Sequence, residues 1–105
     1  MEMRKDMAMT QLITIDGNEI NSENDFHFIL SGLLDFGPYY GNNTDALWDM
    51  LSSGMGAGVI LHWKNANISR QRLAAVFDII IYVFNKTKNK CQGKGKEREF
   101  DFILE

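Results

Sequence analysis

The chain is organised around residues 38–51, which read PYYGNNTDALWDML. The proline, glycine and asparagines near its start predict a tight turn. The side chain of Asn42 or Asn43 can then cap a helix, because an asparagine oxygen accepts from the free N–H groups of a first turn. Three apolar residues follow at the i, i+3, i+4 spacing of one helix face: Leu47, Met50 and Leu51. The stretch therefore predicts a turn that leads into a short amphipathic helix.

A second face of this predicted helix carries two acids and a tryptophan: Asp45, Trp48 and Asp49. Asp45 could simply serve the positive end of the helix dipole, and Trp48 could be a partly buried core residue. Asp49 fits a structural role poorly, because an acid four residues from another costs about 0.2–0.5 kcal/mol. Tyr39 and Tyr40 come just before the helix and could pack inward or face a partner. Together these residues form a candidate binding surface.

The charges of the chain are strongly divided along its length. No Lys or Arg lies between Lys5 and Lys64, and residues 6–63 contain eight acids, a sum of −8. Residues 64–105 hold nine basic and five acidic side chains, a sum of +4. An acidic surface repels phosphate and attracts basic partners. We therefore expect the first half to bind a basic protein and not nucleic acid.

The length of 105 residues suits one domain with one core. We place this domain at residues 11–105, after a flexible extension over residues 1–10 in which Met7 or Met9 could be the true start. The extension lacks the apolar run of a signal peptide, and no segment reaches the ~18–20 apolar residues that span a bilayer. These features predict a cytoplasmic protein.

The cysteine and histidines suggest no metal or redox centre. Cys91 is the single cysteine, so no internal disulfide can form. We expect it to be an exposed thiol, with a redox role as the alternative. His27 is predicted on a helix surface and His62 in a strand, too far apart in sequence to show ligand spacing. We expect no cofactor.

The first part of the chain predicts a strand and a helix. Residues 11–15 are β-rich and predict a strand that ends at an Asp-Gly-Asn turn signal. A helix over residues 23–35 follows, with Asn21 or Ser22 as its cap. Its apolar residues keep helical spacing: Phe26, Ile29, Leu30, Leu33 and Leu34. The Gly-Pro pair at 37–38 ends it.

A glycine-rich connection at residues 54–58, expected to be mobile, follows the organising stretch. Residues 59–63 then predict a strand, whose lack of clean alternation is typical of a central strand covered on both faces. Residues 65–69 are polar and predict a turn or short helix.

Residues 70–90 permit two interpretations. Residues 79–84 alone would suit a strand, whereas apolar residues keep helical spacing across the segment: Leu73, Val76, Phe77, Ile80 and Phe84. Ser69 can cap such a helix, and the lysines of residues 86–90 would suit its negative end. We favour the helix.

The end of the chain predicts a connector and a last strand. Residues 86–98 are lysine-rich and predict a flexible connector, for which phosphate binding is the alternative. Residues 100–104 predict a third strand. Strands separated by helices pair in parallel through right-handed crossovers, so the order predicts an α/β fold.

The motif of residues 39–49, YYGNNTDALWD, stands shortly before a glycine-rich turn and the strand VILHW of residues 59–63. Together they resemble the barstar family, small intracellular inhibitors of microbial ribonucleases. The likeness extends to Val83 and Phe84 and covers about three quarters of the chain. It implies a barstar-like three-stranded parallel sheet packed with about four helices, and a helix over residues 70–90.

The resemblance also implies a site and a partner. Asp49 would take the place of a substrate phosphate, Asp45 would meet another basic side chain, and Tyr39 would stack on a catalytic histidine. The loop and the rim of the contact complete the implied partner-binding set: Tyr39, Tyr40, Gly41, Asn43, Asp45, Trp48 and Asp49. The partner would be a basic ribonuclease or ribonuclease toxin, bound 1:1 by an antitoxin or immunity protein.

Departures from the family lie at the periphery of the implied contact. Lys86 falls where the family has an acidic contact, and Gly54 and Gly56 replace an aromatic and an acid. The connector after Cys91 is longer, and the N-terminus is extended. These differences concern which enzyme is bound.

Two other function classes stay open on the residues alone. One is a regulatory binding module on the same fold with a partner that is not a ribonuclease. Asp45 and Asp49 could also do acid–base chemistry, but no nucleophile, metal set or phosphate loop accompanies them. We therefore expect no enzymatic activity.

Overall fold

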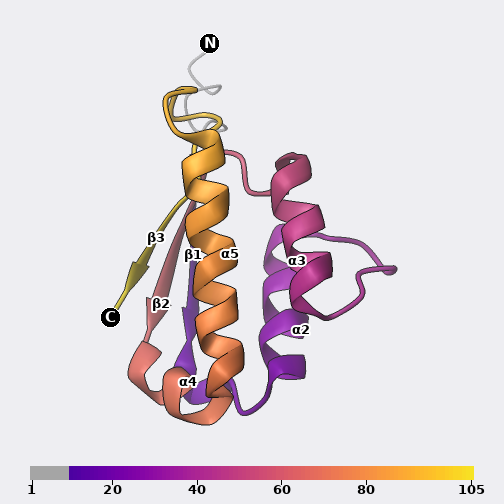
Figure 1. Ribbon diagram of the computed structural model, residues 1–105, viewed down its shortest axis with the longest axis vertical. Helices are drawn as coiled ribbons and strands as arrows, with labels where there is room; N and C mark the ends of the chain where they lie inside the picture. Colours follow the sequence, from indigo (N-terminus) through magenta and orange to yellow (C-terminus); the bar gives the residue numbers. More distant parts are fainter. Residues whose placement is uncertain (1–9) are drawn as a thin grey trace.

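The computed structural model describes residues 10–105 and contains a three-stranded parallel sheet with helices beside it (Figure 1). The strands are β1 (Gln11–Asp16), β2 (Val59–Lys64) and β3 (Asp101–Leu104), in the order β1-β2-β3. The longer helices are α2 (Glu23–Leu34), α3 (Thr44–Met50), α4 (Ala66–Leu73) and α5 (Ala75–Cys91). Two short segments are the 3-10 helix η1 (Gly17–Glu19) and the π-helical η2 (Leu51–Met55). The predicted α/β fold with parallel pairing is confirmed.

The predicted N-terminal extension lies outside the described residues, apart from Thr10. In the part that is described, no helix is both long enough and apolar enough to cross a membrane.

The core lies between β2 and the helices. Trp63 of β2 is fully buried and stacks on Phe26 of α2, with ring centroids 5.3 Å apart. Phe77 of α5 packs on the same indole at 5.2 Å. The indole N–H donates to the hydroxyl of Ser69 (3.0 Å), so the buried donor is satisfied. Ser69 is therefore a buried residue inside α4, and its predicted role as a helix cap is wrong.

The prediction that β2 is covered on both faces is wrong. Its burial alternates, with Val59, Leu61 and Trp63 buried and the residues between them half-exposed. Leu12 of β1 is 68% exposed and Ile103 of β3 is 48% exposed, so the second face of the sheet is open. α2, α3 and α5 lie to one side of the sheet (Figure 1). The apolar residues of the open face reflect strand propensity and not burial.

The helix favoured over residues 70–90 is confirmed, and the strand alternative is excluded because residues 79–84 lie within α5. The helix is divided at Ala74, which has a φ of 52° and a ψ of −124°. Because α5 continues to Cys91, the connector begins later than predicted. Cys91 itself is half-buried and not exposed.

The connection between α3 and β2 begins with a helical segment, which the glycine-rich sequence did not predict. Residues of η2 continue from α3 as a π-helical segment, in which Gly54 has a φ of 111°. Glycine adopts such a φ without a Cβ penalty.

The stability of the junction between β1 and α4 depends on Gly17. A Cβ at Gly17 would overlap the carbonyl oxygen of Asn65 and lie 2.8 Å from the Ser69 hydroxyl. We expect Gly17→Ala to lower the free energy of unfolding by about 1–3 kcal/mol, as overpacking does. The matched control is Gly32→Ala in α2, where a Cβ meets nothing within 4 Å and helix propensity improves. Urea unfolding measures both, and equal stability of the two variants would contradict this account.

Candidate protein-binding surface

The organising stretch forms α3 and the loop before it. Asn43 is the cap of α3, because its Oδ1 accepts from the N–H of Ala46 (2.8 Å). Its amide nitrogen also donates to the carbonyl of Gly41 (3.2 Å). Asn42, the alternative cap, instead adopts a left-handed φ of 55°. The cap thus fixes the end of the loop to the first turn of the helix.

The two faces of α3 differ as predicted. Leu47 is buried and Met50 is half-buried against the core, whereas Asp45 and Asp49 are exposed. Neither carboxylate forms an ion pair with any residue of the described range 10–105. One turn of helix separates them, so they present two negative charges on one side of a rigid element.

The two tyrosines of the loop point to different surroundings. Tyr39 is 96% exposed, on a loop that projects from the body between α2 and α3 (Figure 1). Tyr40 is half-buried, and its ring lies 4.9 Å from that of Phe36. Its hydroxyl is 2.7 Å from Nδ1 of His27. Tyr39 is thus available to a partner, while Tyr40 ties the loop to α2.

His27 is fully buried, so its prediction as a helix-surface residue is wrong. Its Nε2 lies 3.0 Å from a carboxylate oxygen of Glu23, one turn earlier in α2. Burial lowers the pKa of His27 below its usual value, against the opposing influence of Glu23. In the neutral form, Nε2–H donates to Glu23 and the Tyr40 hydroxyl donates to Nδ1. Burial also raises the pKa of Tyr40, which keeps this hydroxyl protonated.

Sequence reasoning missed these hydrogen bonds of the buried His27 with Glu23 and Tyr40. A signal was available, because His27 precedes Leu30 and Leu34 at i+3 and i+7, on the buried stripe of α2. The prediction of a surface position for His27 rests on the polarity of histidine and neglects its position in this stripe.

Trp48 lies at the seam between α3 and α5. It is half-buried against the core, and the ammonium of Lys86 lies 4.2 Å from the centre of its ring. The ammonium of Lys90 lies 5.7 Å from the same ring. An ammonium over an indole face is held by the ring quadrupole. Trp48 therefore joins the acidic face of α3 to a basic edge of α5.

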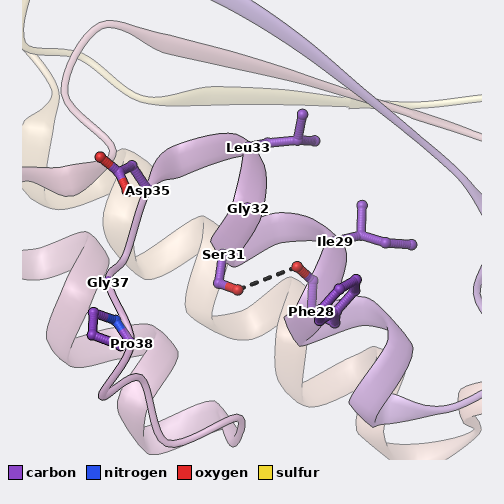
Figure 2. Close-up of a pocket in the computed structure, with 8 residues that line it drawn as sticks. All are labelled: Phe28, Ile29, Ser31, Gly32, Leu33, Asp35, Gly37 and Pro38. Carbon is purple, nitrogen blue, oxygen red and sulfur yellow. Dashed lines mark hydrogen bonds between the residues drawn. The ribbon is translucent and has the colours of Figure 1, made fainter.

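An open hollow of about 550 Å³ lies on α2 beside this surface (Figure 2). Phe28, Leu33 and Pro38 line it, and its one titratable side chain is Asp35. The Ser31 hydroxyl at its edge donates to the carbonyl of Phe28 (3.2 Å). Within residues 10–105, no three His, Cys, Asp or Glu side chains gather to hold a metal ion.

Comparison with known proteins identifies the family of the chain. The family model described as Barstar (barnase inhibitor) matches residues 10–105. The chain is also 32% identical, over 93 residues, to the Bacillus subtilis (strain 168) protein named "Putative ribonuclease inhibitor YrdF". That alignment covers 89% of this chain and 97% of the relative.

The structure defines a small α/β protein built on a three-stranded parallel sheet, with an acidic helix and loop held at its surface. The chain belongs to the barstar family. The resemblance found in residues 39–63 is thereby confirmed.

The buried contact of Tyr40 predicts unequal effects of hydroxyl removal. Tyr40→Phe leaves Nδ1 of His27 without its partner, and an unsatisfied buried polar group costs about 1–3 kcal/mol. Tyr39→Phe is the matched control, because the exposed hydroxyl of Tyr39 loses only contact with water. Chemical denaturation measures both variants. If Tyr39→Phe lowers the free energy of unfolding as much as Tyr40→Phe does, a stabilising hydrogen bond between Tyr40 and His27 is contradicted.

The lowered pKa of His27 predicts a pH dependence of stability. In the unfolded chain the pKa of His27 is near 6.5, the usual value for histidine, and folding lowers it. At pH values between the folded and unfolded pKa, the unfolded state therefore binds more protons than the folded state. The free energy of unfolding then falls as the pH drops below about 6.5. It levels off below the folded pKa. Unfolding curves from about pH 7.5 to pH 5 measure this fall, and His27→Gln should lack it; the same slope in both proteins would exclude His27 as the cause.

Proposed function

We propose that this protein binds a microbial ribonuclease and occludes its active site by phosphate mimicry. The observation that carries the proposal is the pair of exposed carboxylates, Asp45 and Asp49, on a capped helix and without an ion pair to any described residue. Family membership supports the same role, since the family is described as an inhibitor of barnase.

The chemistry of a ribonuclease site explains why this arrangement would bind. Such a site holds phosphate, so it is concave and basic. A carboxylate on a rigid helix loses little conformational freedom on entering it. Burying that charge is favourable only where cationic donors meet it, as bidentate arginines do. Asp49 would occupy a phosphate position, and Asp45 would pair with a neighbouring basic group.

The remaining residues of the site take supporting roles in this proposal. Tyr39 is free to stack on a ring of the enzyme, because its own ring is almost wholly exposed. Gly41 and Asn43 shape the loop, and Trp48 packs at the rim. Tyr40 supports the loop from within through His27.

The complex would be 1:1, and the protein would serve as an immunity protein or antitoxin without catalytic activity. Protection is needed where the RNA of the producing cell is, so the proposed place of action is the cytoplasm.

The proposal is tested with barnase and a panel of ribonuclease toxin domains encoded beside barstar-family genes. Titration against RNA hydrolysis should give stoichiometric loss of activity for at least one enzyme. Asp49→Asn should weaken that inhibition by at least about 2 kcal/mol, as for a central hot spot, a class of residue for which this family itself is a standard example.

The matched control is Glu19→Gln, which removes one negative charge from an exposed site on η1. It should leave inhibition nearly unchanged. If no enzyme of the panel is inhibited, or if both variants inhibit equally, active-site mimicry by Asp49 is excluded.

A further inference from the structure

Basic side chains line the edge of α5 next to α3 and continue into the following connector. We call this set the basic strip: Lys86, Lys90, Lys94 and Arg98. None of them forms an ion pair with a described residue. By contrast Lys88, on the same helix, pairs with Asp101 at 3.0 Å. The basic strip therefore carries positive charges that form no ion pair with a carboxylate of the described residues.

The far end of the strip surrounds a hollow of about 280 Å³. Lys90, Lys94 and Arg98 line it from α5 and the connector, and Ser52 and Ser53 line it from η2. Within the described chain, Lys90 donates to the carbonyl of Ser52 (3.0 Å). Several cations around one hollow repel one another, and a carboxylate placed between them would relieve that repulsion.

The near end of the strip adjoins the proposed ribonuclease contact. Lys86 sits over the ring of Trp48, and Trp48 lies in α3 between Asp45 and Asp49. The same ammonium is 5.7 Å from the ring of Tyr82, which is 64% exposed. A partner that covers the carboxylates therefore meets Lys86 at the edge of the same surface.

We propose that the basic strip is the second half of the ribonuclease contact and binds an acidic segment of that enzyme. One carboxylate would lie beside Lys86, and another would enter the hollow between Lys90, Lys94 and Arg98. The contact with Trp48 restrains the Lys86 ammonium before binding, which reduces the ordering cost. This inference rests on the proposed function and adds the specificity of the site.

Charge selects this occupant over others. An RNA strand on the basic strip would run beside Asp45 and Asp49, which repel its phosphates. A ribonuclease with acids next to its basic cleft complements both halves of the surface. An enzyme with cations at that position would be rejected by the strip, so the strip acts by repulsion as well as attraction.

The test compares two double charge reversals with the same change in net charge. Lys86→Glu with Lys90→Glu alters the strip, and Lys64→Glu with Lys96→Glu alters exposed lysines outside it. The probe is the panel enzyme that the wild-type chain inhibits most strongly, catalytically silenced, and calorimetry gives its affinity. The strip variant should bind about tenfold more weakly, or about 1.4 kcal/mol, and the control about as tightly as wild type. Acidic residues of the enzyme are then replaced by lysine one at a time, and at least one of these replacements should restore binding of the strip variant.

Unchanged or tighter binding by the strip variant overturns the inference, because added acids would favour a purely basic partner surface. Failure of every acid-to-lysine change to restore binding overturns it as well. The inference is also overturned if the wild-type chain binds a fluorescent single-stranded RNA and the strip variant does not, while the strip variant still binds the enzyme. That result would assign the strip to nucleic acid. In each case the wild-type chain still binds through Asp49, so the proposed function stands; inhibition of no enzyme at all would instead defeat the proposed function.

Discussion

The position of the loop before α3 depends on hydrogen bonds at the buried His27, which link Glu23 of α2 to Tyr40 of the loop. These groups come from α2 and from the loop, so they hold together parts of the chain that are 13 residues apart. A buried imidazole is costly unless both nitrogens have partners. The hydrogen bonds therefore run in one direction, from the Tyr40 hydroxyl to His27 and from His27 to Glu23, and they hold the loop from inside. Asn43 holds the other end of the loop to α3. Tyr39 and the acids of α3 are thereby held in place without contributing to the core themselves.

The same arrangement keeps unfavourable electrostatics at the surface of the free protein. Asp45 and Asp49 repel each other across one helical turn, and Asp49 lies near the negative end of α3. No described residue pairs with either. The basic strip on the neighbouring helix and connector likewise forms no ion pair with a described residue. A partner with the opposite pattern would relieve both, which is why a divided surface suits recognition better than it suits the isolated fold.

The sequence alone was sufficient for the architecture and for the acidic face of α3. Apolar spacing located α2, α3 and most of α5, and strands separated by helices implied the parallel sheet. The errors have a common physical origin, since they depend on which other elements pack nearby. Tyr40 of the loop supplies the partner of the buried His27 Nδ1, and Ser69 is buried beside Trp63, from whose indole N–H it accepts. The break at Ala74 occurs at a residue that gives no local signal for a positive φ. The lysines after residue 86 extend α5 because lysine is a good helix former whose head group stays in water.

In the proposed complex, a carboxylate of this protein occupies the position of an RNA phosphate in the enzyme. The most direct measurement is the affinity of the complex at increasing concentrations of a 3′-nucleotide that fills the catalytic cleft of the ribonuclease. Phosphate mimicry predicts strict competition, with an apparent Kd that rises in proportion to the nucleotide concentration once the cleft is saturated. An apparent Kd that stays constant, with enzyme, nucleotide and inhibitor in one ternary complex, would contradict it.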